Sequence, residues 1–226
     1  MKLPEVLYED NHLLVLNKEA GVLVQGDATG DEPLAEIAKR YIGQKYNKPG
    51  AVFMGVVHRL DRPVSGVVVL ARTSKALQRM NELFREKATA KTYYAITSNK
   101  PPVEQGTLVH WLKKDEKKNK TTAYSKETDG ALRSELSFAV LDVKQNLYLL
   151  EVKPITGRPH QIRVQLASIG CPIKGDLKYG DREANPDGSI CLHARQLEFI
   201  HPVKKEPLVV KAAVPAIYPW TIFKID

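Results

Sequence analysis

Residues 52–70 read VFMGVVHRLDRPVSGVVVL, and this stretch decides how the chain is expected to fold. Two apolar, β-branched runs, 52–57 and 67–70, are typical of short buried strands. They flank the segment from His58 to Gly66, in which Pro63 lacks the backbone donor that a strand ladder needs. The pattern therefore predicts two strands joined by a loop that carries several charged side chains.

Strand patterns also outnumber helix patterns on both sides of this stretch. Short apolar or alternating runs predict strands at residues 6–8, 13–17, 91–97, 106–111, 121–125, 134–142, 147–153, 194–200 and 208–213. Helical periodicity predicts helices at 32–46, at 74–87 with Ser74 as the cap, after 156–159 with Pro159 near the first helical position, and from Pro215. The expected fold class is α+β, a mixed, largely antiparallel sheet with flanking helices, in one domain over residues 1–226.

The charge balance and the cysteines narrow the class of protein. Lys and Arg number 34 against 26 Asp and Glu, so the net charge is +8, which favours a polyanionic partner such as nucleic acid. There is no run of 18 apolar residues, and the N-terminus carries acidic residues where a signal peptide needs apolar ones. Cys171 and Cys191 form no CxxC pair and are expected to be buried thiols. We expect a cytoplasmic protein that does not enter a membrane.

One carboxylate in the loop stands out. Asp61 has Arg59 two residues before it and Arg62 directly after it. In a partly buried loop these cations would keep Asp61 ionised, and a cation not facing Asp61 could hold a phosphate. A solvated surface ion cluster is the simpler alternative for these residues alone.

A second basic cluster opens the helix after residue 159. Arg158, His160 and Gln161 crowd its first turn, where anionic groups bind readily. Arg163 follows beside the apolar face, so its guanidinium is expected to be half-buried and to need an acidic partner. The alternative is a helix cap followed by an ordinary surface arginine.

Two further features concern nucleic-acid binding and metals. Tyr93 and Tyr94 point to opposite faces of one strand, so one is expected in the core while the other could stack on a base. The lysine run at 113–120 reads as a solvated hairpin tip that could touch phosphates. Six histidines without metal-ligand spacing make a metal site improbable.

The loop resembles a family signature. His58-Arg59-Leu60-Asp61-Arg62-x-x-Ser65-Gly66 is similar to the motif of the RluA-type pseudouridine synthases, which isomerise uridine to pseudouridine in RNA without a cofactor. The resemblance covers nearly the whole chain in order and includes residues 7–18, Lys91-x-Tyr93-x-Ala95, Gly157-Arg158-x-His160-Gln161-Ile162-Arg163, Leu192-His193-Ala194 and Phe199-x-His201-Pro202.

The resemblance implies a role for each matched residue. Asp61 would be the catalytic aspartate, Tyr93 the aromatic ring against the uracil, and Arg163 the ion-pair partner of Asp61. Leu192 would form an apolar wall, and Arg59 would fill the space left by the extruded base or hold the RNA backbone. The remaining residues expected to bind substrate are His58, Arg62, Arg158, His160 and Gln161.

The chain also departs from the family pattern. Glu19 stands where a proline is common, and Gln25 where a histidine is common, which puts substrate detail in doubt. The chain begins at the catalytic domain, so we expect no S4 RNA-binding domain. That expectation favours a tRNA or a short stem-loop, although the sequence does not decide between tRNA and ribosomal RNA.

The implied chemistry suits one carboxylate. The reaction breaks the C1′–N1 glycosidic bond, turns the uracil and rejoins it through C5, with Asp61 as nucleophile or as base. A hydrolytic glycosidase would need two carboxylates, and this loop supplies one. Because the target uracil is stacked within the RNA, the enzyme must flip the nucleotide out to reach it. We expect a monomer that binds RNA and uses no metal. The alternatives are an RNA-binding protein without activity and a metal-dependent nuclease that uses Asp61 and His58.

Overall fold

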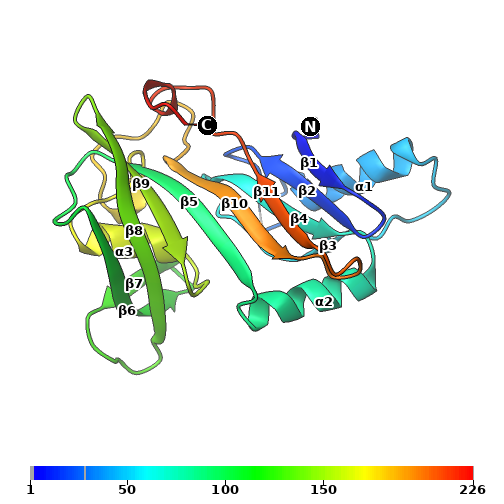
Figure 1. Ribbon diagram of the computed structural model, residues 1–226, viewed down its shortest axis with the longest axis horizontal. Coiled ribbons are helices and arrows are strands. Elements are labelled where there is room, and N and C mark those ends of the chain that lie inside the picture. The colour runs from blue at the N-terminus through cyan, green and yellow to red at the C-terminus, as the bar shows by residue number, and fades with distance from the viewer. Residues whose placement is uncertain (1–2, 28, 226) are drawn as a thin grey trace. The chain divides into compact units, whose positions relative to one another are not determined.

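The computed structural model describes residues 3–27 and 29–225 and shows helices and largely antiparallel strands, which confirms the predicted α+β class (Figure 1). The chain forms two compact units. Unit 1 contains the residues up to 90 together with 194–213, and unit 2 contains 91–193 together with the residues from 214 onward.

Unit 1 is built on antiparallel strands. Its strands lie in the order β1–β2–β4–β10, with β3 on β4 and β11 on β10. Their bounds are β1 (Val6–Glu9), β2 (Leu13–Lys18), β3 (Gly55–Val56), β4 (Ser65–Ala71), β10 (Leu192–Ile200) and β11 (Pro207–Lys211). The first two residues of β10, Leu192 and His193, belong to unit 2. Every residue of β4 is buried, as its continuous apolar sequence predicts.

Two helices belong to unit 1. In α1 (Leu34–Lys45), Leu34, Ile37, Ala38 and Ile42 are buried and Tyr41 is half-buried, as the helical periodicity of residues 32–46 predicts. Helix α2 (Ser74–Arg85) places Ala76 and Met80 in the core, packed against β4. The prediction of Ser74 as its cap is wrong by one residue, because the Thr73 hydroxyl accepts the Ala76 N–H at 3.1 Å.

The strand predicted over 52–57 is shorter in the structure. Only Gly55 and Val56 pair with β4, and Gly55 already lies opposite Ala71, the last residue of that strand. Residues before Gly55 therefore have no β4 residue to pair with. After Val56, the Val69 N–H donates to His58 Nε2 at 3.1 Å. A side chain thus replaces the next backbone partner of the ladder.

Unit 2 holds the long hairpins. Its strands lie in the order β5–β9–β8–β6–β7, and each neighbouring pair is antiparallel. Their bounds are β5 (Thr89–Thr97), β6 (Gln105–Asp115), β7 (Lys120–Tyr124), β8 (Leu132–Lys144) and β9 (Leu147–Pro154). Gln145 and Asn146 both have positive φ, as a two-residue hairpin turn requires.

The helical segments of unit 2 correct two predictions. Helix α3 (Gln161–Ser168) is capped by His160 at φ 55°, so Pro159 lies outside the helix and not at its first position. The 3₁₀ turn η1 (Leu177–Tyr179) packs against α3. The helix expected from Pro215 is the 3₁₀ turn η2 (Trp220–Ile222), because Pro219 lacks the donor that would continue a helix across it.

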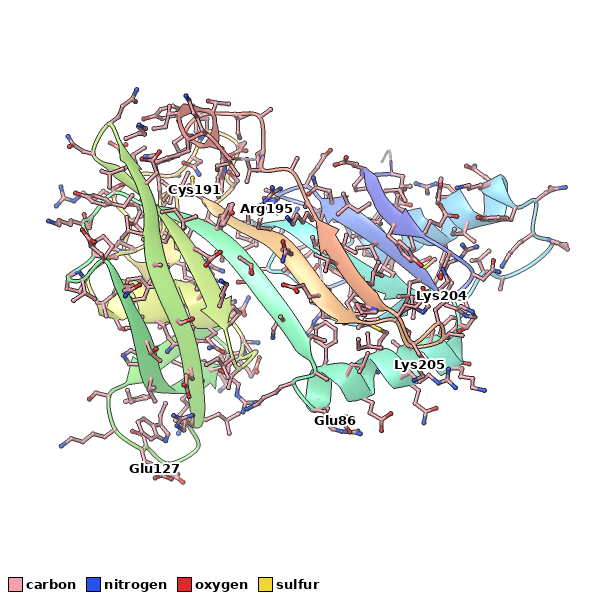
Figure 2. All side chains as sticks on the ribbon, in the orientation of Figure 1. Glu86, Glu127, Cys191, Arg195, Lys204 and Lys205 are labelled. Carbon is pink, nitrogen blue, oxygen red and sulfur yellow. The ribbon has the colours of Figure 1, made fainter. Side chains whose placement is uncertain are left out.

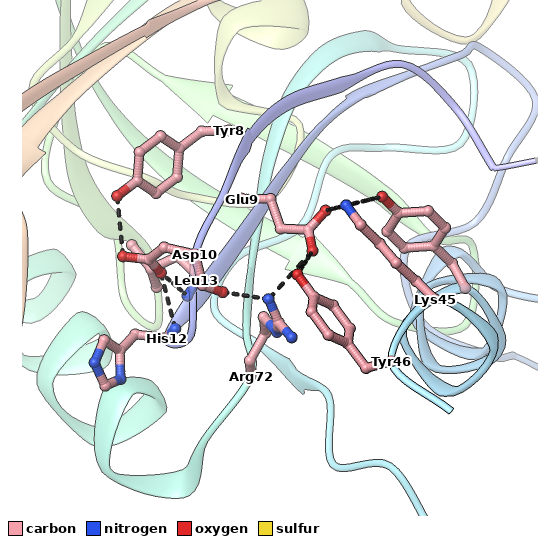
Figure 3. A network of polar contacts seen from close by, with 9 residues as sticks. Tyr8, Glu9, Asp10, His12, Leu13, Lys45, Tyr46 and Arg72 are labelled. Atoms are coloured by element: carbon pink, nitrogen blue, oxygen red, sulfur yellow. Dashed lines mark hydrogen bonds and ion pairs between the residues drawn. The ribbon is translucent and has the colours of Figure 1, made fainter. Parts of the chain in front are cut away.

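Glu9 and Asp10 connect the turns of unit 1 through hydrogen bonds and ion pairs (Figure 3). The Glu9 carboxylate accepts hydrogen bonds from Tyr41, Lys45 and Tyr46 on the α1 side and pairs with Arg72. Burial alone would raise the pKa of Asp10, but hydrogen bonds from the backbone N–H groups of residues 12 and 13 and from Lys204 and Tyr8 lower it. This network joins the β1–β2 turn to α1 and to the β10–β11 turn.

Both cysteines are buried, as predicted, and Cys191 lies directly before β10 (Figure 2). Burial raises the pKa of the Cys191 thiol to about 11, so it stays protonated near neutral pH. Among residues 3–27 and 29–225, no helix is long and apolar enough to cross a membrane.

Candidate active site

The signature loop of unit 1 is anchored on both sides of Asp61. Leu60 and Val64 are buried, and the Val64 N–H donates to the Asp61 carbonyl at 3.0 Å. The Arg62 carbonyl accepts the Gly21 N–H at 2.8 Å. Asp61 itself is half-buried. The loop therefore presents one carboxylate from a backbone that is fixed before and after it.

The two arginines beside Asp61 differ in their contacts. Arg62 donates from Nε to the Gly21 carbonyl at 3.0 Å, and its Nη2 lies 2.6 Å from an Asp31 carboxylate oxygen. Arg59 is exposed. Arg62 thus helps to hold the loop against the turn at Gly21, and the predicted contacts of Arg59 and Arg62 with substrate stay predictions.

His58 supports the loop from the side of α2. Its Nε2 accepts the Val69 N–H at 3.1 Å, and its ring stacks on Phe84 with centroids 5.0 Å apart. Because Nε2 accepts, the proton of the neutral ring is assigned to Nδ1. These contacts give His58 a structural role, and contact with substrate stays a prediction.

The signature glycine has a physical explanation. Gly66 has φ +115°, a conformation that side-chain-bearing residues rarely adopt, and a Cβ there would lie 2.6 Å from the Ala194 nitrogen. Gly66 therefore lets β4 approach the backbone of β10 directly after the loop.

Lys18 is a functional candidate that residue-by-residue reasoning on the sequence missed. Its side chain is fully buried, and its ammonium donates to the carbonyls of Glu19, Val22 and Arg62 at 3.0, 2.8 and 3.2 Å. Burial lowers the pKa of Lys18 to about 7, an effect that the Asp61 charge opposes and the Arg62 charge reinforces. A buried cation thus lies within electrostatic range of the candidate carboxylate.

In unit 2, two candidate residues lie on strands. Tyr93 lies opposite Val152 in the β5–β9 pair and is half-buried, as is Tyr94. Neither residue is fully buried, and the expectation that one ring packs inward while the other faces a groove stays a prediction. Leu192 is buried at the start of β10, and the neighbouring Cys191 carbonyl accepts the Ile96 N–H at 2.9 Å.

The segment before α3 is held by Gln161. This buried side chain donates to the Glu135 carbonyl at 3.0 Å and accepts from the Thr156 hydroxyl at 2.8 Å and the Arg158 N–H at 3.0 Å. Those contacts give Gln161 a local structural role. Arg158 is exposed and His160 half-buried, so both are accessible, and their contacts with RNA stay predictions.

Arg163 is more buried than expected, at 5% exposure. Its Nε and Nη2 donate to the two carboxylate oxygens of Asp176 at 2.7 and 2.8 Å. The guanidinium carbon lies 5.1 Å from the centroid of the Tyr179 ring, and the Tyr179 hydroxyl lies 2.7 Å from His160 Nδ1. A bidentate pair and a stacked ring thus fix the guanidinium plane.

The need for an acidic partner of Arg163 is confirmed, and Asp176 supplies one. Two N–H groups of the guanidinium, one on Nε and one on Nη2, donate to Asp176. The pairing of Arg163 with Asp61 stays a prediction. What the structure shows is an anchored carboxylate loop in unit 1 and, in unit 2, a guanidinium held by Asp176 and the Tyr179 ring.

Comparison with known proteins assigns the family. The sequence model of the family described as RNA pseudouridylate synthase matches residues 12–168, which include Asp61, Tyr93 and Arg163. This chain belongs to the RNA pseudouridylate synthase family. It is therefore an isomerase that converts uridine to pseudouridine in RNA, and the resemblance drawn from the motifs is confirmed.

Curated relatives agree with this assignment. The synthase is 32% identical over 211 residues to the ribosomal large subunit pseudouridine synthase C of Rickettsia prowazekii (strain Madrid E), covering 93% of this chain and 68% of the relative. It is 33% identical over 220 residues to the protein of the same name from Escherichia coli (strain K12), covering 92% and 65%. The chain thus spans about two thirds of the length of these relatives.

A solved structure shows the same fold. Human RNA pseudouridylate synthase domain containing 4 superposes with a TM-score of 0.77 and 26% sequence identity, covering 93% of this synthase and 88% of that chain.

Proposed function

We propose that the synthase modifies large-subunit ribosomal RNA and that Asp61 is its catalytic carboxylate. The role of Asp61 is supported by the anchored loop, which presents this carboxylate between the buried Leu60 and Val64. The relatives from Rickettsia prowazekii and Escherichia coli, both ribosomal large subunit pseudouridine synthases, support the choice of RNA. They outweigh the sequence argument for a tRNA, which rested on the expected absence of an S4 domain.

We assign two further roles from the motifs. Tyr93, half-buried on β5, stacks on the uracil and retains it after the glycosidic bond breaks. Arg163 supplies the cation that keeps Asp61 ionised during the reaction. Its fixed guanidinium plane supports this role, since a group held in place needs no reorganisation when charge develops.

The reaction needs little else from the protein. Breaking the C1′–N1 bond and forming a C1′–C5 bond conserves the composition of the nucleotide, because C5 loses its hydrogen to water as a proton and N1 takes up a proton in its place. Asp61 either attacks the sugar or removes a sugar proton. The basic surface holds the RNA backbone while the target nucleotide is flipped out. We also propose that the protein acts as a monomer in the cytoplasm.

The test is release of tritium from RNA labelled at uridine C5. The protein is incubated in separate reactions with unmodified transcripts of large-subunit ribosomal RNA and of tRNAs. We expect tritium release from the ribosomal transcript, and chain-termination mapping would then locate the modified uridine. Release from tRNA alone would overturn the choice of RNA. Binding without release would favour an inactive RNA-binding protein, and chain cleavage would favour a nuclease.

A further inference from the structure

The end of the β6–β7 hairpin carries a concentrated positive charge. Residues 113–120 contain five lysines and two acids, a net +3 out of the chain's +8. The turn between Asp115 and Lys120 is solvent-exposed, and Lys178 of η1 reaches it by donating from Nζ to the Asn119 carbonyl at 3.1 Å. We call Lys117, Lys118, Lys120 and Lys178 the hairpin patch.

The acids of the hairpin are engaged locally and leave the patch cationic. Glu116 pairs with Lys114 at 2.6 Å, and an Asp115 carboxylate oxygen accepts the Lys118 backbone N–H at 3.0 Å. Within the described part of the chain, no ion pair involves Lys117, Lys118 or Lys120. These ammonium groups are available to an external anion.

The patch is held in a fixed place relative to the segment before α3. The Thr121 N–H donates to the Tyr179 hydroxyl at 2.8 Å, and the Thr121 hydroxyl donates to the Pro159 carbonyl at 3.0 Å. Thr121 is buried, and its bond to the Tyr179 hydroxyl is shielded from water. The exposed lysines therefore keep a defined distance from His160 and Arg163.

We propose that the hairpin patch binds phosphates of the RNA outside the flipped nucleotide and so adds affinity without taking part in the chemistry. This inference rests on the proposed function, which supplies RNA as the binding partner of the hairpin patch. Residues 113–120 contain no apolar side chain, which disfavours a membrane surface because interfacial binding relies on buried apolar area. Lysines act as point charges that suit a phosphate backbone and read no base sequence.

The test compares two double variants of equal net charge. Lys117→Gln/Lys118→Gln removes two cations of the patch, and Lys48→Gln/Lys75→Gln removes two exposed cations of unit 1 as the control. Binding to a large-subunit ribosomal RNA transcript is measured by filter retention between about 50 and about 200 mM KCl. Single-turnover pseudouridine formation is measured at saturating RNA.

We expect the hairpin variant to bind about tenfold more weakly, with a salt slope less steep by about 1.5, since each lost phosphate contact removes about 0.7–0.9. Its rate at saturating RNA and the slope of the control should match the wild type. A wild-type slope in the hairpin variant, or an equal change in both variants, overturns the inference. Loss of binding to phosphatidylserine vesicles with unchanged RNA binding would also overturn it. If the wild type binds RNA but forms no pseudouridine, the proposed function fails while the slopes still decide this inference.

Discussion

Arg163 and Asp176 form a buried ion pair whose two members depend on each other. Asp176 is 1% exposed and Arg163 5% exposed, so neither charge has water to replace its partner. Removing one partner of such a pair costs about 3–5 kcal/mol, because the other charge is left stranded in a poor solvent. We expect Asp176→Asn to lower the free energy of unfolding by about 3 kcal/mol, measured by urea denaturation.

The matched control is Asp142→Asn in β8. That carboxylate lies 3.9 Å from Lys144, and both side chains are more than a third exposed. The change should cost less than about 0.5 kcal/mol, as for other exposed pairs. Equal losses in the two variants would show that burial of the Arg163–Asp176 pair has no special effect on stability.

Tyr93 should act through its ring. Tyr93→Phe keeps the stacking surface and should retain substantial activity, whereas Tyr93→Ala should lose about 10- to 100-fold, because stacking contributes about 1–3 kcal/mol per base. Single-turnover rates on the ribosomal transcript separate the two cases. Equal inactivity of both variants would mean that the hydroxyl takes part in proton transfer.

For Arg163, the sequence predicted burial and the need for an acidic partner, but not which residue is that partner. Its position beside Ile162 and Leu166 indicated burial and an acidic partner, and both are present. Helical periodicity could not identify Asp176 as that partner, because Asp176 lies 13 residues after Arg163, past the end of α3. Lys18 was missed for a similar reason, since its carbonyl partner at Arg62 is 44 residues distant.

Among the elements, the strand β4 depends on Gly66, its second residue. Gly66→Ala places a Cβ against the backbone of Ala194 and in an unfavourable φ region. We expect a loss of more than about 3 kcal/mol, because backbone at this point cannot move aside cheaply. Gly21→Ala is the control, since Gly21 has φ +87° with nothing within 4 Å of the added Cβ. It should cost about 1 kcal/mol by thermal or urea unfolding, and similar costs at both sites would refute the steric account.

Elements with strong periodicity were predictable, and their ends were not. The apolar positions of α2 gave its extent within about two residues, as expected for helix boundaries. The cap moved to Thr73 because two adjacent hydroxyl residues satisfy the same sequence rule. The start of α3 was misplaced because His160 adopts a left-handed φ that no local pattern signals.

At the scale of the whole molecule, Lys18 links stability to pH. Its pKa is about 7 when folded and near 10.5 when unfolded. Below pH 7 both states hold the proton, so this contribution is constant. Between pH 7 and 10.5 the unfolded chain keeps a proton that the folded chain has lost, so the free energy of unfolding rises with pH by up to about 1.4 kcal/mol per unit.

The comparison variant for this effect is Lys18→Met, which cannot titrate. Urea unfolding of both proteins from pH 6 to 10 gives their difference in stability at each pH. We expect that difference to shift in favour of the wild type as the pH increases above about 7. A difference that does not change with pH would show that the folded state does not lower the pKa of Lys18.

In the proposed reaction, Asp61 performs the chemistry while the basic surface holds the RNA. The most direct measurement is the single-turnover rate of Asp61→Asn on the ribosomal transcript, together with its RNA affinity. The near-isosteric amide removes the charge but keeps the loop, so the rate should fall by more than about a hundredfold, or about 2.7 kcal/mol. RNA affinity should stay within a few-fold of the wild type, since phosphate contacts are unchanged. Turnover above about one per cent of the wild-type rate would contradict the assignment of Asp61 as the catalytic carboxylate.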